Sequence, residues 1–535
     1  MSTMQNINNK VKTFDDIKPS GYYTFDEEIT KCKYIYANSI IYLDSVNEYS
    51  KGHQNIFSDA NAKPNLYLTQ FNLLQYFLLE NPGYKSKFQN KPDAIELTPL
   101  GSLEGSTENE ITVFGMLLVN ESKKVQLQDG LNIVTLDISQ VQNWGEGYFT
   151  SGSCVLCQGV YKNEVIKVKL IIHPPPVWNK ATFEEKYEKD FFGAISKAFK
   201  HGSEDDEIRK KAKDMKKGLI NTNPKKKLEE NFLNSFLNRD LAQNKILYPK
   251  YTERPIDING NIEKMRQSQY DSTLIETMFT RSSKILQDEF FLILSNPDLT
   301  NHNVLVAIEK IVLGYQQRIS GEKIKTPFMI IFMGNFIPEQ SYNSFKVLAS
   351  AFENLTNILL KNTFLVQNCY FVFLPGPDDF SLFNGYPKHP FIPSIIDNLK
   401  KKIPNVINAT NPCRFSLFGK EVVIFRDDLN KKLSRNSIKT TEIVNQIDAY
   451  VHTILSQGNL TPVPLSIVPR IWHLGQCMTM LPLPDILILG DVVEDFTKDM
   501  NEEMIVVNPG NFSKDFSFSQ IFPLRMKSQS CKVDN

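Results

Sequence analysis

The residues that could carry chemistry gather in short loops of the C-terminal half of the chain. We expect each of these loops to follow a strand, and each contains at least one Asn or Asp. The loops are residues 295–298, 334–336, 375–379, 457–459, 490–493 and 508–512. Because ligands of α/β proteins bind at the carboxyl ends of strands, these loops are where a function should be sought.

One of these loops contains two adjacent carboxylates, Asp378 and Asp379. A pair of carboxylates can share acid and base roles when their surroundings separate their pKa values. A turn after Pro377 explains the same two residues without any catalysis, and we favour this interpretation. The chain has no G-x-x-x-x-G-K-[ST] motif, which argues against a P-loop ATPase.

The histidines are sparse and offer little further chemistry. His173 and His389 stand beside prolines, where we expect surface or packing roles. His452 and His473 flank the loops of interest, but two histidines cannot assemble a two-metal centre.

The cysteines do not indicate a metal site or a disulfide framework. Cys154 and Cys157 have the spacing of half a zinc site, but they lie on one expected strand and no second pair stands at a suitable distance. We therefore expect buried strand cysteines. Seven cysteines scattered over 535 residues suit a reducing compartment.

The loops are positioned by a regular alternation of strands and helices. Apolar runs at 290–295, 328–333, 370–374, 421–425, 486–489 and 504–507 predict strands, and amphipathic stretches at 304–315 and 342–360 predict helices. This alternation favours a layered α/β domain.

The preceding part of the chain has a different pattern. Five short β-rich runs lie at 111–119, 124–128, 132–138, 153–161 and 165–172. Five closely spaced antiparallel strands of this length predict a small barrel of the OB type. Prolines from Pro174 to Pro176 end the unit, because proline cannot donate to a continuing ladder.

The fold class is therefore multidomain α+β, with an OB-type barrel followed by a layered α/β domain. We expect a partly helical, linker-like segment at 1–105, the barrel at 106–180, a Lys-rich insert at 181–272 and the α/β domain at 273–535. The first segment contains one helical stretch at 66–79 and a Pro- and Gly-punctuated linker at 91–105. The insert has a basic run at 225–227, for which a solvated face, a nuclear-import signal and a DNA-backbone contact stay open.

Composition excludes several classes of protein. Apolar residues make up 41% and charged residues 22%, so the chain can bury a core. Lys and Arg together number 60, as do Asp and Glu, which argues against a globally basic nucleic-acid coat. No apolar run approaches the ~20 residues that span a bilayer, and no secretory signal is evident at the N-terminus.

The series of loops resembles the calcineurin-like metallophosphoesterase fold, whose active members hold two metal ions with Asp, His and Asn side chains. The resemblance aligns the eight candidate positions with those ligands. Neutral amides stand in several places that Asp or His would fill, and Val cannot bind a metal. The resemblance therefore implies a degenerate site without metal or cofactor, at Asn296, Asp298, Asn335, Asp378, Asp379, Asn459, Asp491 and Val493.

Such a domain after an OB barrel resembles the B-subunit family of the replicative DNA polymerases alpha, delta and epsilon. The motifs P-G-P-D-D at 375–379, N-P-C-R at 411–414 and L-S-Q-G-N-L-T-P at 455–462 resemble the epsilon branch. The resemblance extends from about Thr13 to Phe522, without the Lys-rich insert.

The resemblance implies a non-catalytic accessory subunit in the nucleus, which holds the zinc-binding C-terminal domain of the catalytic subunit of DNA polymerase epsilon. Histone-fold subunits would be indirect neighbours, and the complex would bring the chain near DNA. Animal and fungal members begin with a helical domain that is associated with docking to the replicative helicase through GINS. Only a dozen polar residues precede the matching segment here, so the GINS contact stays open, as does a shortened gene model.

Other functions remain open at this stage. The chain could be the B subunit of polymerase alpha or delta. A metallophosphoesterase with rearranged ligands and a single-strand-binding module are alternatives from other classes, and the latter predicts an affinity that falls steeply with salt. The expected barrel strands carry few aromatic residues for base stacking, which favours a protein-facing barrel.

Overall fold

The computed structural model describes residues 32–35, 40–43, 62–178 and 288–534, apart from short gaps at 88, 106–109, 131, 140, 142, 316–325, 339–343, 382–383, 418–419, 440–442, 482 and 501–502. The Lys-rich insert at 181–272, its basic run and the first part of the family resemblance, residues 13–28, lie outside the described residues. Among the described residues no helix is long and apolar enough to cross a membrane.

The five β-rich runs form a closed barrel, as the sequence predicts. The strands are β5 (Glu110–Val119), β6 (Val125–Gln128), β7 (Ile133–Asp137), β9 (Cys154–Lys162) and β10 (Val165–Ile172). They pair in the order β7-β6-β5-β9-β10, and a β7–β10 pairing closes the ring. The closing pair is parallel, and a short strand β8 (Asn143–Trp144) adds to β10, so the expectation of five purely antiparallel strands is wrong in these details. Alternate residues such as Val113 and Leu117 fill the interior.

The segment before the barrel packs on it. Helix α3 (Ala62–Glu80) confirms the predicted helix, and its Phe71 ring stacks on Phe114 of the barrel at 5.3 Å between ring centroids. The expected linker is wrong as a description of 91–105. It contains β4 (Ile95–Glu96), which pairs with β3 (Tyr84–Lys85), and a short 3-10 helix η2 (Leu100–Gly105), whose Leu100 and Leu103 are buried against the barrel.

Two mixed sheets form the centre of the α/β domain. The first has the order β14-β13-β12-β11-β20-β21 and the second β15-β16-β17-β19-β18. The first sheet comprises β11 (Phe291–Ser295), β12 (Met329–Met333), β13 (Tyr370–Leu374), β14 (Val406–Asn408), β20 (Ser517–Phe522) and β21 (Lys527–Lys532). The second comprises β15 (Cys413–Leu417), β16 (Lys420–Arg426), β17 (Ile486–Gly490), β18 (Phe496–Met500) and β19 (Met504–Asn508). Strands β11 to β14 run parallel, as do β16, β17 and β19.

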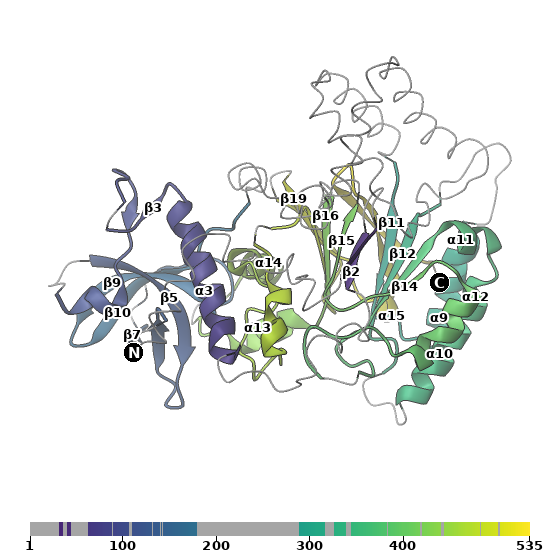
Figure 1. Cartoon of the computed structure of the whole chain (residues 1–535), viewed down its shortest axis with the longest axis horizontal. Helices are drawn as coiled ribbons and strands as arrows, with labels where there is room; N and C mark the ends of the chain where they lie inside the picture. Colours follow the sequence, from purple (N-terminus) through teal and green to yellow (C-terminus); the bar gives the residue numbers. More distant parts are fainter. Residues whose placement is uncertain are drawn as a thin grey trace, which may run out of the picture.

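Helices cover the outer face of each sheet and complete four layers (Figure 1). The first sheet carries α9 (His302–Gly314), α10 (Ser344–Leu359), α11 (Thr363–Asn368) and α12 (Pro393–Lys402). The second carries α13 (Leu429–Asn436) and α14 (Gln446–Gln457), which lie toward the barrel in Figure 1, and η5 (Trp472–Met478), which contacts α3. A short helix, α15 (Phe512–Asp515), precedes β20. The predicted alternation of strands and helices is confirmed.

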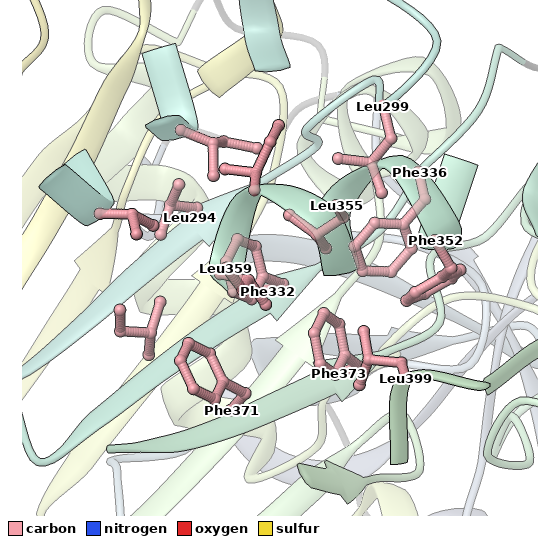
Figure 2. Packing of buried hydrophobic residues seen from close by; sticks show 14 of the residues in the cluster. Leu294, Leu299, Phe332, Phe336, Phe352, Leu355, Leu359, Phe371, Phe373 and Leu399 are labelled. Atoms are coloured by element: carbon pink, nitrogen blue, oxygen red, sulfur yellow. The ribbon is translucent and has the colours of Figure 1, made fainter. Parts of the chain in front are cut away.

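The two-residue period of a strand decides which layer each side chain joins. On β11, Leu292 and Leu294 pack with the helices, whereas Phe291 and Ile293 pack between the sheets. Figure 2 shows the helix-side cluster, in which the rings of Phe332, Phe352 and Phe373 pack among leucine side chains. Strands buried on both faces must be continuously apolar, which explains the uninterrupted runs seen in the sequence.

A hairpin of β1 (Cys32–Ile35) and β2 (Ile40–Leu43) pairs antiparallel. Strand β2 lies beside β15, at the edge of the second sheet (Figure 1).

Candidate functional site

The parallel strands bring several of the predicted site residues together at one edge of the sheets. Asn335, after β12, and Asp378, after β13, pair reciprocally: Nδ2 of Asn335 donates to Asp378 Oδ2 at 2.6 Å, and the Asp378 backbone N–H donates to Asn335 Oδ1 at 2.9 Å. Asn296, after β11, accepts the backbone N–H of Asn335 at 3.3 Å. Asn296 has a φ of 57°, in the left-handed region that Asn tolerates better than most residues.

Asp379 is buried, and its carboxylate shapes the backbone. Its Oδ1 accepts the N–H of Phe336 and its Oδ2 that of Gly376, both at 2.8 Å. Burial raises the pKa of Asp379 to about 6, although these hydrogen bonds and the charges of Lys388 and Arg426 oppose the rise. Asp378 is exposed and has separate partners, so the two adjacent carboxylates act in a turn and do not face a common point.

Asp298 and Asp491 also bind backbone groups. Asp298 Oδ1 accepts the N–H and the hydroxyl of Thr300, at 2.9 and 2.6 Å, just before helix α9 begins. Asp491 follows β17, is buried, and accepts the N–H of Asn430 at 2.9 Å. Burial raises the pKa of Asp491 to about 6. Val493, two residues on, contributes its carbonyl as the acceptor for Asn508 Nδ2 at 3.1 Å.

Asn459 lies apart from this set. It follows helix α14, and its Nδ2 donates to Oε1 of Gln70 on α3 at 3.2 Å. Its Oδ1 accepts the N–H of Thr461 at 2.8 Å. Its side chain therefore joins α3 to the α/β domain. The prediction of a strand-end loop at 457–459 is wrong, because these residues end and follow helix α14.

Arg426 is the central residue that the sequence patterns did not single out. It ends β16 and is fully buried. Its guanidinium donates to Asn296 Oδ1 at 3.2 Å and to the carbonyl of Gly490 at 3.1 Å, and it pairs with Asp428 Oδ1 at 2.5 Å. A charged residue at the end of an apolar run, followed by two Asp residues, is the signal that could have identified it.

The donor set does not fit the two-metal centre that the calcineurin-like resemblance would imply. Among the described residues no three His, Cys, Asp or Glu side chains are grouped to hold an ion. The carboxylates of Asp298, Asp379 and Asp491 each accept backbone N–H groups. A guanidinium also lies among the strand ends, where it would repel a metal cation.

A second polar cluster joins the barrel to the α/β domain. Gln457, the last residue of α14, donates from Nε2 to the carbonyl of Cys154 at 2.7 Å and accepts the N–H of Cys154 through Oε1 at 2.8 Å. Thr453 Oγ1, one turn earlier, accepts the N–H of Tyr148 at 2.8 Å. Cys154 and Cys157 are both fully buried on β9, which confirms the interpretation as strand cysteines.

His173 also belongs to this cluster, and its hydrogen bonds fix one neutral tautomer. Gln457 Nε2 donates to its Nδ1 at 3.0 Å, so Nε2 carries the proton and donates to the Tyr148 carbonyl at 3.1 Å. The ring stacks on Phe149 at 4.2 Å. Burial, with His452 nearby, lowers the pKa of His173 to about 3. The packing role expected for His173 is confirmed, and His452 lies at this junction, 5.8 Å from His173 between ring centroids.

Comparisons with protein families match two parts of the chain. Residues 60–175 match a model described as the OB-fold domain of DNA polymerase epsilon subunit 2-like proteins. Residues 291–498 match a model that describes the B subunits of DNA polymerases alpha and epsilon. The first match takes in helix α3 together with the barrel, and the second takes in most of the two-sheet domain.

Curated relatives extend these matches along the chain. The chain is 25% identical over 492 residues to "DNA polymerase epsilon subunit 2" of Bos taurus, covering 90% of this chain and 77% of the relative. It is 24% identical over 553 residues to the B subunit of DNA polymerase epsilon from Schizosaccharomyces pombe, covering 98% and 78%. A "Probable DNA polymerase epsilon subunit 2" of Caenorhabditis elegans is 32% identical over 251 residues, covering 46% of this chain and 45% of the relative.

Proposed function

Because the chain belongs to the B-subunit family of DNA polymerases alpha and epsilon, we propose that it acts as a non-catalytic accessory subunit of DNA polymerase epsilon. The similarity to epsilon B subunits over nine-tenths of the chain carries this proposal. The same similarity disfavours the alternative of an alpha or delta subunit. The chain is thus a member of a polymerase complex that contains a catalytic subunit.

The state of the strand-end residues supports the non-catalytic part of the proposal. A hydrolase needs carboxylates that are free to bind metal or move a proton. Here Asp379 uses both oxygens to accept backbone N–H groups, and Asp378 is paired with Asn335. We regard the eight aligned positions as vestiges of a phosphoesterase-like site whose side chains now shape the loops.

The mechanism is then binding and placement. The barrel and the α/β domain are joined by buried hydrogen bonds from Gln457 and Thr453, so they can present one fixed surface to a partner. The partner that we propose is the zinc-binding C-terminal domain of the polymerase epsilon catalytic subunit, in the nucleus. A permanent interface of this kind should bury more than ~2,000 Å² and be apolar at its centre.

A competitive capture experiment tests the proposal. The full chain is co-expressed with the zinc-binding C-terminal domains of the catalytic subunits of polymerases epsilon, alpha and delta. We expect a stable one-to-one complex with the epsilon domain alone. Capture of the alpha or delta domain would change the polymerase, and capture of none would overturn the scaffold role. The variant Gln457→Leu should weaken capture, whereas Gln446→Leu, an exposed glutamine of the same helix, should not.

An activity assay tests the non-catalytic part separately. The purified chain is incubated with bis(p-nitrophenyl) phosphate and Mn²⁺, and we expect no hydrolysis above that of a buffer blank. Hydrolysis that disappears in the variant Asp379→Asn would show a working site and contradict the proposal.

A further inference from the structure

Arg426 connects the ends of strands from both sheets. Its Nε donates to the carbonyl of Gly334, just after β12. Its Nη2 reaches Asn296 Oδ1 after β11 at 3.2 Å, and its Nη1 reaches the carbonyl of Gly490 at the end of β17 at 3.1 Å. Because β11 and β12 belong to the first sheet and β16 and β17 to the second, one side chain bridges the two sheets at their loop edge.

The charge of this side chain is matched locally. Asp428 Oδ1 lies 2.5 Å from Nη1 and forms an ion pair. Burial alone lowers the pKa of Arg426, but the charges of Asp428, Asp491 and Asp427 outweigh it and hold the pKa above its usual value. Asp427 is itself paired with Lys432 at 2.6 Å. The guanidinium is therefore a permanent buried cation with an acidic partner.

The backbone of Arg426 is held as firmly as its side chain. Asn411 Oδ1 accepts its N–H at 3.0 Å, and Asn411 Nδ2 donates to its carbonyl at 2.7 Å. The Tyr386 hydroxyl donates to the same carbonyl at 3.0 Å. The space is also filled, since a Cβ added at Gly490 would lie 3.0 Å from Arg426 Cδ and 2.9 Å from Ser295 Oγ.

We propose that the Arg426 guanidinium is a built-in cation that takes the place of a bound metal at the strand ends and supplies a positive charge there. The groups around it are two backbone carbonyls, one amide oxygen and one carboxylate, all hard oxygen donors of the kind that Ca²⁺ and Mg²⁺ prefer. The five N–H donors of the fork satisfy these oxygens without an ion. The loops are consequently organised with no need for a metal, whichever partner the chain binds.

Metal binding by the unmodified full chain is the first test. The protein is dialysed against EDTA, then incubated with Mn²⁺ or Ca²⁺, and bound metal and the melting temperature are measured. We expect no stoichiometric metal and no change in melting temperature. One equivalent of metal that also raises the melting temperature would overturn the proposal.

Removal of the guanidinium is the second test. Arg426→Ala should lower the melting temperature by roughly 10 °C, because it leaves Asp428 and the carbonyls without their partner. Millimolar Ca²⁺ or Mn²⁺ should restore part of this loss by occupying the vacated oxygens. The matched control is Arg414→Ala, which removes a buried guanidinium that donates to the carbonyls of Cys477 and Thr479, at 2.9 and 2.8 Å. Neither ion should restore the melting temperature of Arg414→Ala.

Two outcomes of the variant series would overturn the proposal: no rescue of Arg426→Ala by either ion, or equal rescue of Arg414→Ala. Should Arg426→Ala be insoluble, Arg426→Lys replaces it, because an ammonium keeps the charge but cannot span the three strand ends. A lowered melting temperature of Arg426→Lys supports the proposal, and an unchanged one contradicts it.

Discussion

The side-chain amide of Gln457 forms two hydrogen bonds with the backbone of Cys154, although 303 residues separate them in sequence. The amide thereby pairs with a strand of the barrel much as a neighbouring strand would, at 2.8 and 2.7 Å. Its Nε2 also donates to Nδ1 of His173. The backbone carbonyl of Gln457 accepts an N–H from Nε2 of Gln70, on α3, at 2.6 Å. One residue at the end of α14 thus joins three parts of the fold.

The variant Gln457→Leu should destabilise the protein by about 3 kcal/mol, because it leaves the N–H and C=O of Cys154 and the Nδ1 of His173 buried without this partner. Urea unfolding measures the change. Gln446→Leu, at the exposed start of the same helix, is the control and should change stability little. Equal effects of the two variants would contradict the role assigned to Gln457.

The variant His173→Gln should alter the pH dependence of stability. In the folded chain the pKa of His173 is lowered to about 3, whereas an unfolded histidine titrates near 6.5. The unfolded state therefore takes up a proton first, so this histidine's contribution is complete above about pH 6.5 and falls as the pH drops toward 3. The stability difference between wild type and His173→Gln should shrink by about 2 kcal/mol between pH 7.5 and pH 5.

Urea unfolding of both proteins at pH 7.5, 6 and 5 checks this prediction. Asp379 and Asp491, whose pKa values are raised to about 6, contribute with the opposite sign. Because both carboxylates are present in both proteins, the difference isolates His173. A difference that stays constant with pH would contradict the prediction.

The variant Gly458→Ala should lower the free energy of unfolding by about 2 kcal/mol. Gly458 caps the end of α14 with a φ of 51°, and an added Cβ would lie 2.3 Å from Leu481 Cδ2. Thermal unfolding measures the loss. Gly314→Ala is a matched control at the end of α9, where an added Cβ meets no heavy atom within 4 Å. That control should be neutral or slightly stabilising, and a comparable loss would show that the cost at Gly458 is not conformational.

The variant Phe373→Ala should destabilise the α/β domain by about 4 kcal/mol, because the cavity would open within the helix-side cluster of Figure 2. The Phe373 ring stacks on Phe332 at 5.2 Å and meets Phe352 edge-on at 5.4 Å between ring centroids. Chemical denaturation measures the loss. Val306→Ala, on the solvent side of α9, removes less buried surface and should cost under ~1 kcal/mol.

Local pattern was sufficient for the barrel strands, for the main strands of the two-sheet domain and for helices α3, α9 and α10, but it did not identify α12, α14 or β20. The runs that became β11, β12 and β13 are continuously apolar because both of their faces are buried. The β-rich composition of the runs that became β5 and β6 likewise identified barrel strands. Helix α3 was evident from its helical spacing, but its packing on the barrel was not, because Phe71 and Phe114 meet only in the folded chain.

Three of the aligned positions, Asn296, Asn335 and Asp378, are linked by hydrogen bonds, because parallel strands bring their carboxyl ends to one edge. Asn459 differs from these positions. It follows helix α14 and not a strand, and its partner Gln70 is 389 residues away in the sequence. No local pattern encodes a contact over such a separation.

The sequence by itself determined the barrel strands, the main strands of the two-sheet domain and the helices at 66–79, 304–315 and 342–360, because these follow from short-range periodicity. Only the tertiary structure decided what the residues at the ends of the elements do. In the sequence, Arg426 is a charged residue after an apolar run and Gln457 is a residue near the end of a polar stretch. In the fold, Arg426 binds the strand ends of two sheets and Gln457 binds a strand of the barrel. Hydrogen bonds between distant segments depend on the relative placement of whole layers, and short-range periodicity does not specify that placement.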